Sequence, residues 1–476
     1  MPVPTARVFV PVTSADLSTA GANRVGAWMA SVTPDVAAVA VRVAVDVASR
    51  LRSPEQVEEA AAAARTQTTF PRSTHWIPFT IAQGYAGLAV LWSYLDSCFP
   101  GEGWDSLGRS HLEQAVRGAE TAASRDPGLF SGLSGLAFAG WTLSRGGTRY
   151  RRLLSSLDGA ISASATELAT ALAARRTGVT VGEFDVISGL SGIGAYLLCR
   201  REQLEVEASW EAVVEALVQM TLAEDGLPRW HTPADLMWDE GMLDIYPHGS
   251  LNCGLAHGIP GPLAFMSLSF RAGSRVPGLP EAIARIGDWL NQNRVDDQWG
   301  VNWSTAVPLE QLETPDGPIV LPARSTSAPD GPARCAWCYG SPGIARALWL
   351  AGGALERADF RDLAVSAMEA VFRRPIAVRR IDSSTFCHGV AGLLQIVLRF
   401  VNDTSGTMFV AESRRLVTQL LRGYQPDSLL GYRYLEVPGN EIDQPGLLDG
   451  TPGVALVLLA ASTPVEPVWD RLFLLS

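Results

Sequence analysis

Two kinds of apolar segment alternate along the chain. The first kind is short and apolar at nearly every position, as in LAVLWSYL (residues 88–95) and VALVLLA (residues 454–460). The second kind is longer and apolar on one side only, as in residues 151–176. A helix that is apolar all round must be buried, whereas a one-sided helix covers a core. The alternation therefore predicts buried inner helices paired with amphipathic outer helices, the latter at 206–222, 281–293, 354–372 and 409–423 as well.

A G-x-x-G tetrad opens each short apolar segment. The tetrad occurs seven times, at intervals of 48 to 82 residues: Gly84–Gly87, Gly132–Gly135, Gly189–Gly192, Gly258–Gly261, Gly340–Gly343, Gly389–Gly392 and Gly450–Gly453. A single tetrad carries no information, but seven at the same place before an apolar helix indicate an internal repeat. Glycine at these turns would permit positive φ angles and close approach of backbones.

The repeat predicts an all-α fold, an (α/α)7 toroid. Seven inner helices form a ring, and seven outer helices enclose it. An open α-solenoid is the alternative, but its inner helices would be more polar on the concave face. We expect residues 36–50 and 54–64 to supply the outer partner of the first inner helix.

The chain divides into an N-terminal segment, residues 1–70, and a toroid domain, residues 71–476. Part of the N-terminal segment is expected to form outer helices. Two long linkers, 224–252 and 294–333, lack a helical period and are candidates for a small appendage. The second linker contains a possible strand at residues 317–323.

Composition narrows the class of protein. The net charge is −11, and all 38 basic residues are arginines that form no basic stripe, which argues against nucleic-acid binding. Residues 1–20 do not resemble a secretory signal, and no apolar run reaches the ~18 residues of a membrane helix. We therefore expect a cytoplasmic protein. In such a chain the six cysteines are better read as core residues, metal ligands or nucleophiles than as disulfides.

Three tetrads carry metal-binding residue types just before their first glycine. His257 and His388 directly precede that glycine, and Cys338 and Cys387 lie two residues before it. Equivalent positions in a ring converge at one mouth, so these side chains are expected to meet. Two thiolates and one imidazole (Cys338, Cys387 and His388) suit one Zn²⁺ per chain, with the fourth position open. For any one cysteine, the alternative is packing as a small hydrophobic residue.

The other cysteines lie outside this register. Cys335 forms a C-x-x-C pair with Cys338, a spacing that can bind zinc, but we expect it to be structural or to lie behind the ligands. Cys98, Cys199 and Cys253 are expected to pack in the core.

The segments that carry these residues resemble motifs of the lanthipeptide cyclases, the LanC family. They are EFDVISGLSGI (183–193), GLAHGIPGPL (254–263), AWCYGSPGI (336–344), FCHGVAGL (386–393) and GLLDGTPGVALVLL (446–459). The resemblance extends from about Gly84 to Leu459, whereas the first 70 residues match no motif. In combination, W-C-Y-G, C-H-G and G-L-A-H-G are highly specific.

The resemblance implies an α/α toroid with zinc bound by Cys338, Cys387 and His388. Beside the metal it implies four further residues: Asp185, His257, Arg334 and Tyr339. Members of the family add cysteine thiols of a precursor peptide to dehydroalanine or dehydrobutyrine, which gives lanthionine or methyllanthionine thioether rings. The implied partners are a dehydrated precursor peptide, a separate dehydratase and an exporter complex that would hold the enzyme at the membrane.

General chemistry supports such a reaction. A free thiol has a pKa of ~8.5 and is mostly protonated at neutral pH, and zinc favours its thiolate. Attack on the β-carbon leaves an enolate that needs a proton, and His257 is the leading acid or base. Asp185 could orient that imidazole or take the thiol proton. Arg334 or Tyr339 could stabilise the enolate oxygen, although Arg334 could also form a structural ion pair.

Other functions remain open on the sequence. A related enzyme could add glutathione or another small thiol to dehydrated residues with the same zinc. A zinc-stabilised toroid could bind peptides without chemistry, but a structural site needs a fourth protein ligand rather than an acid–base pair. A toroidal glycoside hydrolase would need paired carboxylates, and only Asp185 stands out.

Overall fold

The computed structural model describes residues 28–70, 76–123, 126–224, 226–237, 240–315, 317–323, 333–381, 383–404, 406–436 and 439–476. Residues 1–27 of the N-terminal segment and 324–332 of the second linker lie outside the described residues.

Seven inner helices begin at the seven tetrads, as the repeat predicts. They are α3 (Tyr85–Cys98), α5 (Leu133–Thr142), α8 (Leu190–Arg200), α11 (Pro260–Arg271), α13 (Ser341–Ala354), α15 (Val390–Asp403) and α17 (Thr451–Ser462). Nearly every residue of α17 is buried, which fits its all-round apolar sequence. Each inner helix contacts the next, and α17 contacts α3, so the ring is closed. The (α/α)7 toroid is confirmed, and the open solenoid is excluded.

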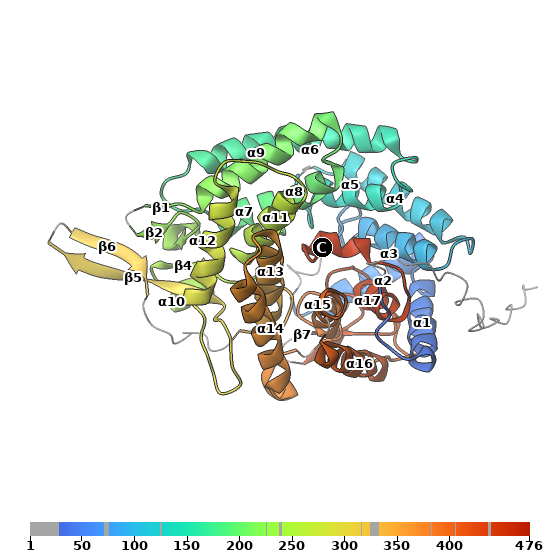
Figure 1. Cartoon of the computed structure of the whole chain (residues 1–476). Coiled ribbons are helices and arrows are strands. Elements are labelled where there is room, and N and C mark those ends of the chain that lie inside the picture. The colour runs from blue at the N-terminus through green and yellow to red at the C-terminus, as the bar shows by residue number, and fades with distance from the viewer. Residues whose placement is uncertain are drawn as a thin grey trace, which may run out of the picture.

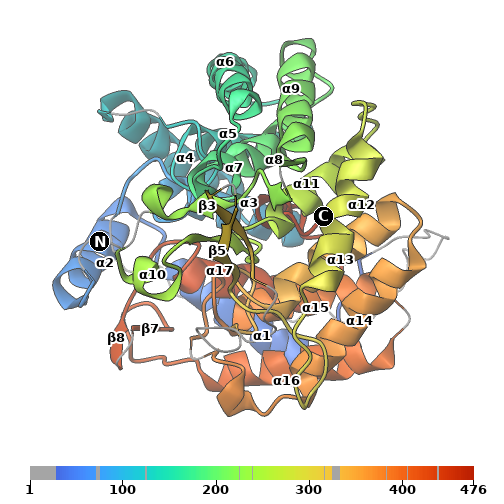
Figure 2. The same ribbon diagram turned by 90° about the vertical axis from the view of Figure 1, so that its left-hand side faces the viewer.

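Outer helices surround this ring (Figure 2). They are α4 (Trp104–Thr121), α6 (Arg151–Ala174), α9 (Leu204–Met220), α12 (Leu279–Gln292), α14 (Ala358–Arg373) and α16 (Thr407–Arg422). Each of them packs against the inner helix that precedes it in the chain. Helix α4, which the sequence analysis did not anticipate, is therefore the outer partner of the first inner helix.

The first described helix completes the outer layer by packing against the last inner helix. Helix α1 (Pro34–Ser49) packs against α17, the last inner helix, rather than serving as the outer partner of the first (Figure 1). Trp28 Nε1 donates to Ala460 O at 2.8 Å beside this contact. Helix α2 (Pro54–Gln67) lies beside α3, where Tyr85 is bonded to Glu58 at 3.2 Å. Helix α1 is thus the outer helix of the seventh repeat.

A closed ring of backbone hydrogen bonds, here called the backbone belt, joins the turns that precede the inner helices. It runs from Ala82 N to Phe130 O, Phe130 N to Ile187 O, Val186 N to Ala256 O, Ala256 N to Cys338 O, Cys338 N to Cys387 O, Cys387 N to Leu448 O and Leu448 N to Ala82 O, at 3.0–3.2 Å. Each acceptor lies two residues before the first glycine of its tetrad. Residues at equivalent positions before the tetrads are therefore neighbours around the ring.

Close packing explains the second glycine of each tetrad. A Cβ atom at Gly192 would lie 2.0 Å from Val186 O, and one at Gly392 would lie 2.0 Å from Phe386 O. Each such oxygen belongs to the turn that enters the belt. Among the tetrad glycines only Gly340 has a positive φ, +99°. The expectation of positive φ is wrong for the other tetrads, where close approach alone requires glycine.

The C-terminal segment fills the bore of the ring, as the position of the C-terminus shows (Figure 1). The 3-10 helix η3 (Val468–Phe473) stacks Phe473 on Phe386 at 3.7 Å between ring centroids, and Trp337 Nε1 donates to Phe473 O at 3.1 Å. The buried carboxylate of Asp470 accepts from Arg399 at 2.6 and 2.7 Å. The toroid is therefore solid on this axis rather than open.

The two linkers fold together beside the mouth of the ring. Strands β3 (Thr232–Pro233) and β4 (Gly249–Asn252) come from the first linker, and β5 (Ala306–Thr314) and β6 (Gly317–Pro322) from the second. They form one antiparallel sheet in the order β3-β4-β5-β6. The β5–β6 hairpin projects from the molecule (Figure 1), and the strand expected at 317–323 is β6.

The remaining elements are short. They are α7 (Val181–Phe184), β1 (Ala223–Glu224), β2 (Leu227–Pro228), η1 (Ala234–Leu236), α10 (Glu240–Ile245), η2 (Ile376–Val378), β7 (Tyr434–Glu436) and β8 (Asn440–Ile442). Strands β7 and β8 form a hairpin immediately before the last tetrad.

Substitution of Gly192 tests the packing argument. Gly192→Ala should destabilise the protein by roughly 3 kcal/mol, because the new methyl group would collide with the Val186 carbonyl in the turn that enters the belt. Gly159→Ala is the matched control, since Gly159 is exposed on α6 with no atom near a new Cβ, and it should stabilise by about 0.5–1 kcal/mol. Urea unfolding of both variants measures the difference. Equal stability of the two would contradict the packing argument.

Candidate active site and metal centre

Two adjacent positions of the backbone belt are cysteines. Cys338 N donates to Cys387 O at 3.2 Å, which places the two thiols side by side, and His388 follows Cys387 directly. The sulfur atoms of Cys338 and Cys387 and one ring nitrogen of His388 all lie within 4.8 Å of one another. A tetrahedral zinc site holds such donors about 3.5–4 Å apart, so small side-chain movements suffice. These three residues could hold a metal ion.

The electrostatics of the two cysteines favour a thiolate. A hydrogen bond from the Cys387 thiol, opposed by burial and assisted by His388 and Arg334, holds the pKa of Cys338 well below its usual range. The pKa of Cys387 is raised by the same hydrogen bond and by burial. Of the two thiols, Cys338 therefore loses its proton more readily. Arg334 lines the same cavity, and its positive charge lowers the pKa values of Cys338 and Cys387.

Asp185 and His257 form a second pair at the mouth. His257 Nδ1 lies 2.6 Å from Asp185 Oδ2. The other oxygen, Oδ1, accepts from the N–H groups of Ser188 and Gly189 at 2.8 Å each, at the start of α8. Asp185 is only 2% exposed, so these bonds fix its orientation. With Nδ1 bound to the carboxylate, Nε2 is the nitrogen left for chemistry.

The charge balance of His257 follows from its surroundings. Burial lowers its pKa, but the hydrogen bond and the negative charge of Asp185, together with Cys338, raise it by more. The net pKa of His257 is above the ordinary value of a histidine. The imidazole therefore keeps a proton to higher pH than a free histidine would.

Tyr339 is held by a residue that the sequence analysis missed. Asn252 Nδ2 donates to the Tyr339 hydroxyl at 3.1 Å, and Asn252 Oδ1 accepts from Gly254 N at 2.8 Å. Burial raises the pKa of Tyr339 far above the range of neutral pH, so the phenol stays protonated and can donate. Asn252 ends β4, and no motif pointed to it.

One cavity of about 400 Å³ collects the candidate groups. It is lined by Phe70, His257, Arg334, Cys338, Tyr339, Ser383, Cys387, His388, Tyr434 and Leu435. Every site residue proposed from the sequence lines this cavity except Asp185. Asp185 is hydrogen-bonded to His257, which does line it. Phe70, Ser383, Tyr434 and Leu435 were missed because they lie outside the tetrad register.

Asp449 directly precedes Gly450, the first glycine of the seventh tetrad, so the tetrad register could also have indicated this residue. Its Oδ1 lies 3.8 Å from His388 Nδ1. Burial raises the pKa of Asp449. The ring of Tyr434 packs edge-on against His388, with 5.5 Å between centroids. His388 is thus enclosed between a carboxyl group and an aromatic ring.

The other cysteines pack in the core or at its edge. Cys335 is buried, its N–H donates to Arg379 O, and burial raises the pKa of its thiol to about 11. Burial likewise raises the pKa values of Cys98 and Cys199 to about 11. These thiols stay protonated at neutral pH, as packing residues should.

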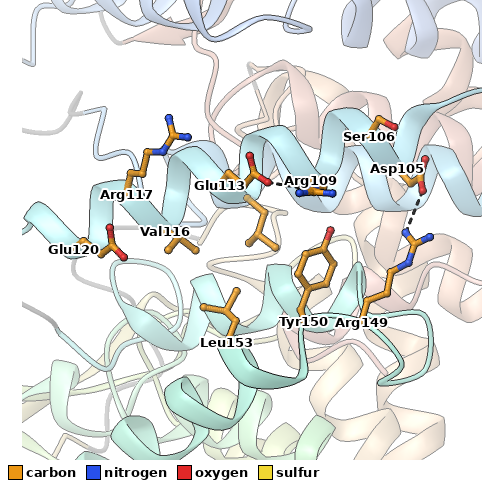
Figure 3. Close-up of a pocket in the computed structure, with 11 residues that line it drawn as sticks. Asp105, Ser106, Arg109, Glu113, Val116, Arg117, Glu120, Arg149, Tyr150 and Leu153 are labelled. Carbon is orange, nitrogen blue, oxygen red and sulfur yellow. Dashed lines mark hydrogen bonds and ion pairs between the residues drawn. The ribbon is translucent and has the colours of Figure 1, made fainter.

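A larger hollow, of about 890 Å³, lies on the outer surface between α4 and the start of α6 (Figure 3). Its charged side chains include Arg109 paired with Glu113 at 2.9 Å and Arg149 paired with Asp105 at 3.1 Å. No cysteine or histidine lines it. Size alone would favour this hollow, but its paired and exposed charges offer no reactive group.

Comparison with known proteins agrees with this geometry. The family described as lanthionine synthetase C-like protein matches residues 75–474. The chain belongs to that family. It is 26% identical over 357 residues to the nisin biosynthesis protein NisC of Lactococcus lactis subsp. lactis, covering 74% of this chain and 82% of that protein.

The structure is similar to that of a nisin cyclase. The two superpose with a TM-score of 0.69 at 23% sequence identity, over 88% of this chain and 97% of the other. This likeness supports the toroid as the fold of the family member described here. Within the described residues, no helix combines the length and the apolar character needed to cross a membrane.

Removal of single ligands tests the metal centre. Cys387→Ala should lose bound zinc, because one of three protein donors is removed, whereas His257→Ala should retain it. Cys335→Ala is the matched control, since it removes a buried cysteine outside the cluster. Metal content after gel filtration, measured by mass spectrometry, decides the matter. Full zinc occupancy in Cys387→Ala would refute the ligand assignment.

Proposed function

We propose that the protein is a zinc-dependent lanthipeptide cyclase. It would add cysteine thiols of a precursor peptide to dehydroalanine or dehydrobutyrine residues of the same peptide and so form thioether rings. One observation carries the proposal: a two-thiol, one-imidazole cluster and an Asp–His pair line a single cavity, in a chain of the lanthionine synthetase C-like family.

The first half of the reaction concerns the thiol. Cys338, Cys387 and His388 would hold zinc, which when bound would supply Lewis acidity that favours the thiolate of a substrate cysteine at neutral pH. With both protein sulfurs coordinated as thiolates, the incoming sulfur would keep its electron density. His388 is held between Asp449 and Tyr434, so its ring has little freedom. With three protein donors, the ion would remain able to accept the sulfur of the peptide.

The second half concerns the proton and the enolate. The sulfur forms a bond to the β-carbon, and the electron pair of the alkene moves through the α-carbon to the carbonyl oxygen. His257 Nε2 returns a proton to the α-carbon, while Asp185 holds the imidazole through Nδ1. Arg334 and the neutral phenol of Tyr339 line the same cavity and stabilise the oxygen as it gains charge. The proton lost by the thiol balances the one gained by carbon.

The proposed reaction defines the partners. A dehydratase must first convert serine or threonine of the precursor, so the substrate is a dehydrated peptide and the dehydratase is a separate protein. An exporter that receives the cyclised product is the third proposed partner, and it would bring the enzyme to the membrane surface.

Counting thiols tests the activity. The purified zinc-loaded protein, incubated with a dehydrated precursor peptide, should consume one alkylatable thiol for every ring formed, without change in peptide mass. Mass gain by the peptide only when glutathione is present would instead indicate addition of a small thiol. Binding of the peptide with every thiol still reactive would indicate a non-catalytic receptor.

The pH profile tests the role of Asp185. Asp185 raises the pKa of His257, and the acid form of a group is lost as pH rises through its pKa. Asp185→Asn should therefore move the alkaline limb of kcat/KM to lower pH, by about one unit or more. His257→Ala, which removes the titrating group, should abolish that limb and most of the activity. An alkaline limb unchanged in Asp185→Asn would contradict the assignment.

A further inference from the structure

Part of the lining of the catalytic cavity is not used by the proposed chemistry. It consists of Phe70, Tyr434 and Leu435, here called the apolar wall, of which Tyr434 packs against His388. His257, Tyr339 and Arg334 also line the cavity and offer the proton and the positive charge. A peptide in this cavity would therefore contact groups of two opposite characters.

Phe70 reaches the cavity from outside the ring of repeats. It follows the C-terminal end of α2, and its side chain is 48% exposed. Tyr434 and Leu435 belong to β7, which enters from the other end of the chain. Two segments that belong to no helix pair thus supply apolar side chains to the lining of one cavity.

A buried carboxylate joins these two segments. Glu436 is 2% exposed, and it accepts hydrogen bonds from Thr69 N at 2.8 Å, Thr69 Oγ1 at 2.9 Å and the Thr68 hydroxyl. Asn440 Nδ2 donates both to Glu436 Oε2 and to Gln67 O, at 2.8 Å each. The turn after α2 is therefore attached to the β7–β8 hairpin by several charge-assisted bonds.

Burying the carboxylate of Glu436 costs free energy, which its hydrogen bonds must offset. Burial raises the pKa of Glu436, but the hydrogen bonds lower it by more, so the group stays ionised. An ionised carboxylate is retained in a buried site only when its acceptor oxygens are satisfied. Thr68 Oγ1 also accepts from Phe70 N at 2.9 Å, so the same network fixes the backbone of Phe70. Glu436 is thus a positioning residue for Phe70.

We infer that the apolar wall recognises an apolar residue next to the substrate cysteine. The inference rests on the proposed function, since it takes the sulfur of the substrate cysteine to lie among Cys338, Cys387 and His388, and Tyr434 packs against His388. A side chain next to that cysteine would then contact Phe70 and Leu435, which line the same cavity. The wall would therefore favour cysteines that have an apolar neighbour.

Binding of unreactive peptides tests the wall. Two fluorescein-labelled peptides carry serine in place of the dehydrated residue and a single cysteine, flanked by leucine in one and by glutamine in the other. Anisotropy titration with the zinc-loaded protein should show about tenfold tighter binding of the leucine peptide. Phe70→Ala should remove most of this preference, and Phe70→Leu should restore it. An unchanged preference in Phe70→Ala would overturn the inference.

A second variant tests the positioning role of Glu436. Glu436→Ala should reduce the leucine preference as Phe70→Ala does. The double variant, Phe70→Ala with Glu436→Ala, should lose no more of that preference than either single variant, because both changes act through the Phe70 side chain. Additive losses would contradict this role. Leu204→Ala is the control: Leu204 is 88% exposed at the start of α9, at the end of the ring away from the mouth, and the preference should be unchanged.

The two proposals can fail separately. Ring formation by the wild type without a leucine preference would overturn the wall and leave the cyclase intact. A Phe70-dependent preference with no ring formation on any dehydrated peptide would contradict the cyclase and leave the apolar recognition in place.

Discussion

The backbone belt is the constraint on which the rest of the structure depends. Seven turns, separated by as many as 82 residues, are joined edge to edge by peptide hydrogen bonds. Because the same register position enters the belt in each repeat, side chains at that position and the next are brought to one mouth. Neighbouring repeats become neighbours in the cavity, and the thiols of Cys338 and Cys387 meet for that reason. Once the belt exists, a single substitution in one repeat places a new group among those of the others.

Much of this arrangement could be predicted from the sequence because it is periodic. The glycine tetrads predicted the ring of helices. The positions of Cys338, Cys387 and His388 relative to the tetrads predicted that these side chains lie together. Departures from the period were harder. Helix α1 packs on α17 through contacts between opposite ends of the chain, and Glu436 binds Thr69 across 367 positions. No local pattern encodes such contacts, so Phe70 and the β7–β8 hairpin were missed, as was Asn252 behind Tyr339.

Two kinds of structure position the residues that line the cavity. The candidate reactive groups are fixed by the most regular features. The N–H groups of Ser188 and Gly189, just before α8, hold Asp185, and the belt itself holds the cysteines. The apolar wall is built from segments outside the helix pairs, which are attached by side-chain hydrogen bonds. The specificity proposed for the wall would therefore depend on different contacts from those that hold the reactive groups.

The position of the chain ends has a consequence for biosynthesis. Helix α1 and α17 pack together, the last belt bond returns from Leu448 to Ala82, and η3 occupies the bore. Synthesis proceeds from α1 towards η3, so the ring stays open until its seventh repeat has been made. The thiols of Cys338 and Cys387 emerge before that repeat and lack their complete surroundings until then. Closure of the ring thus completes the mouth, and a chain truncated within the seventh repeat would lack both closure and plug.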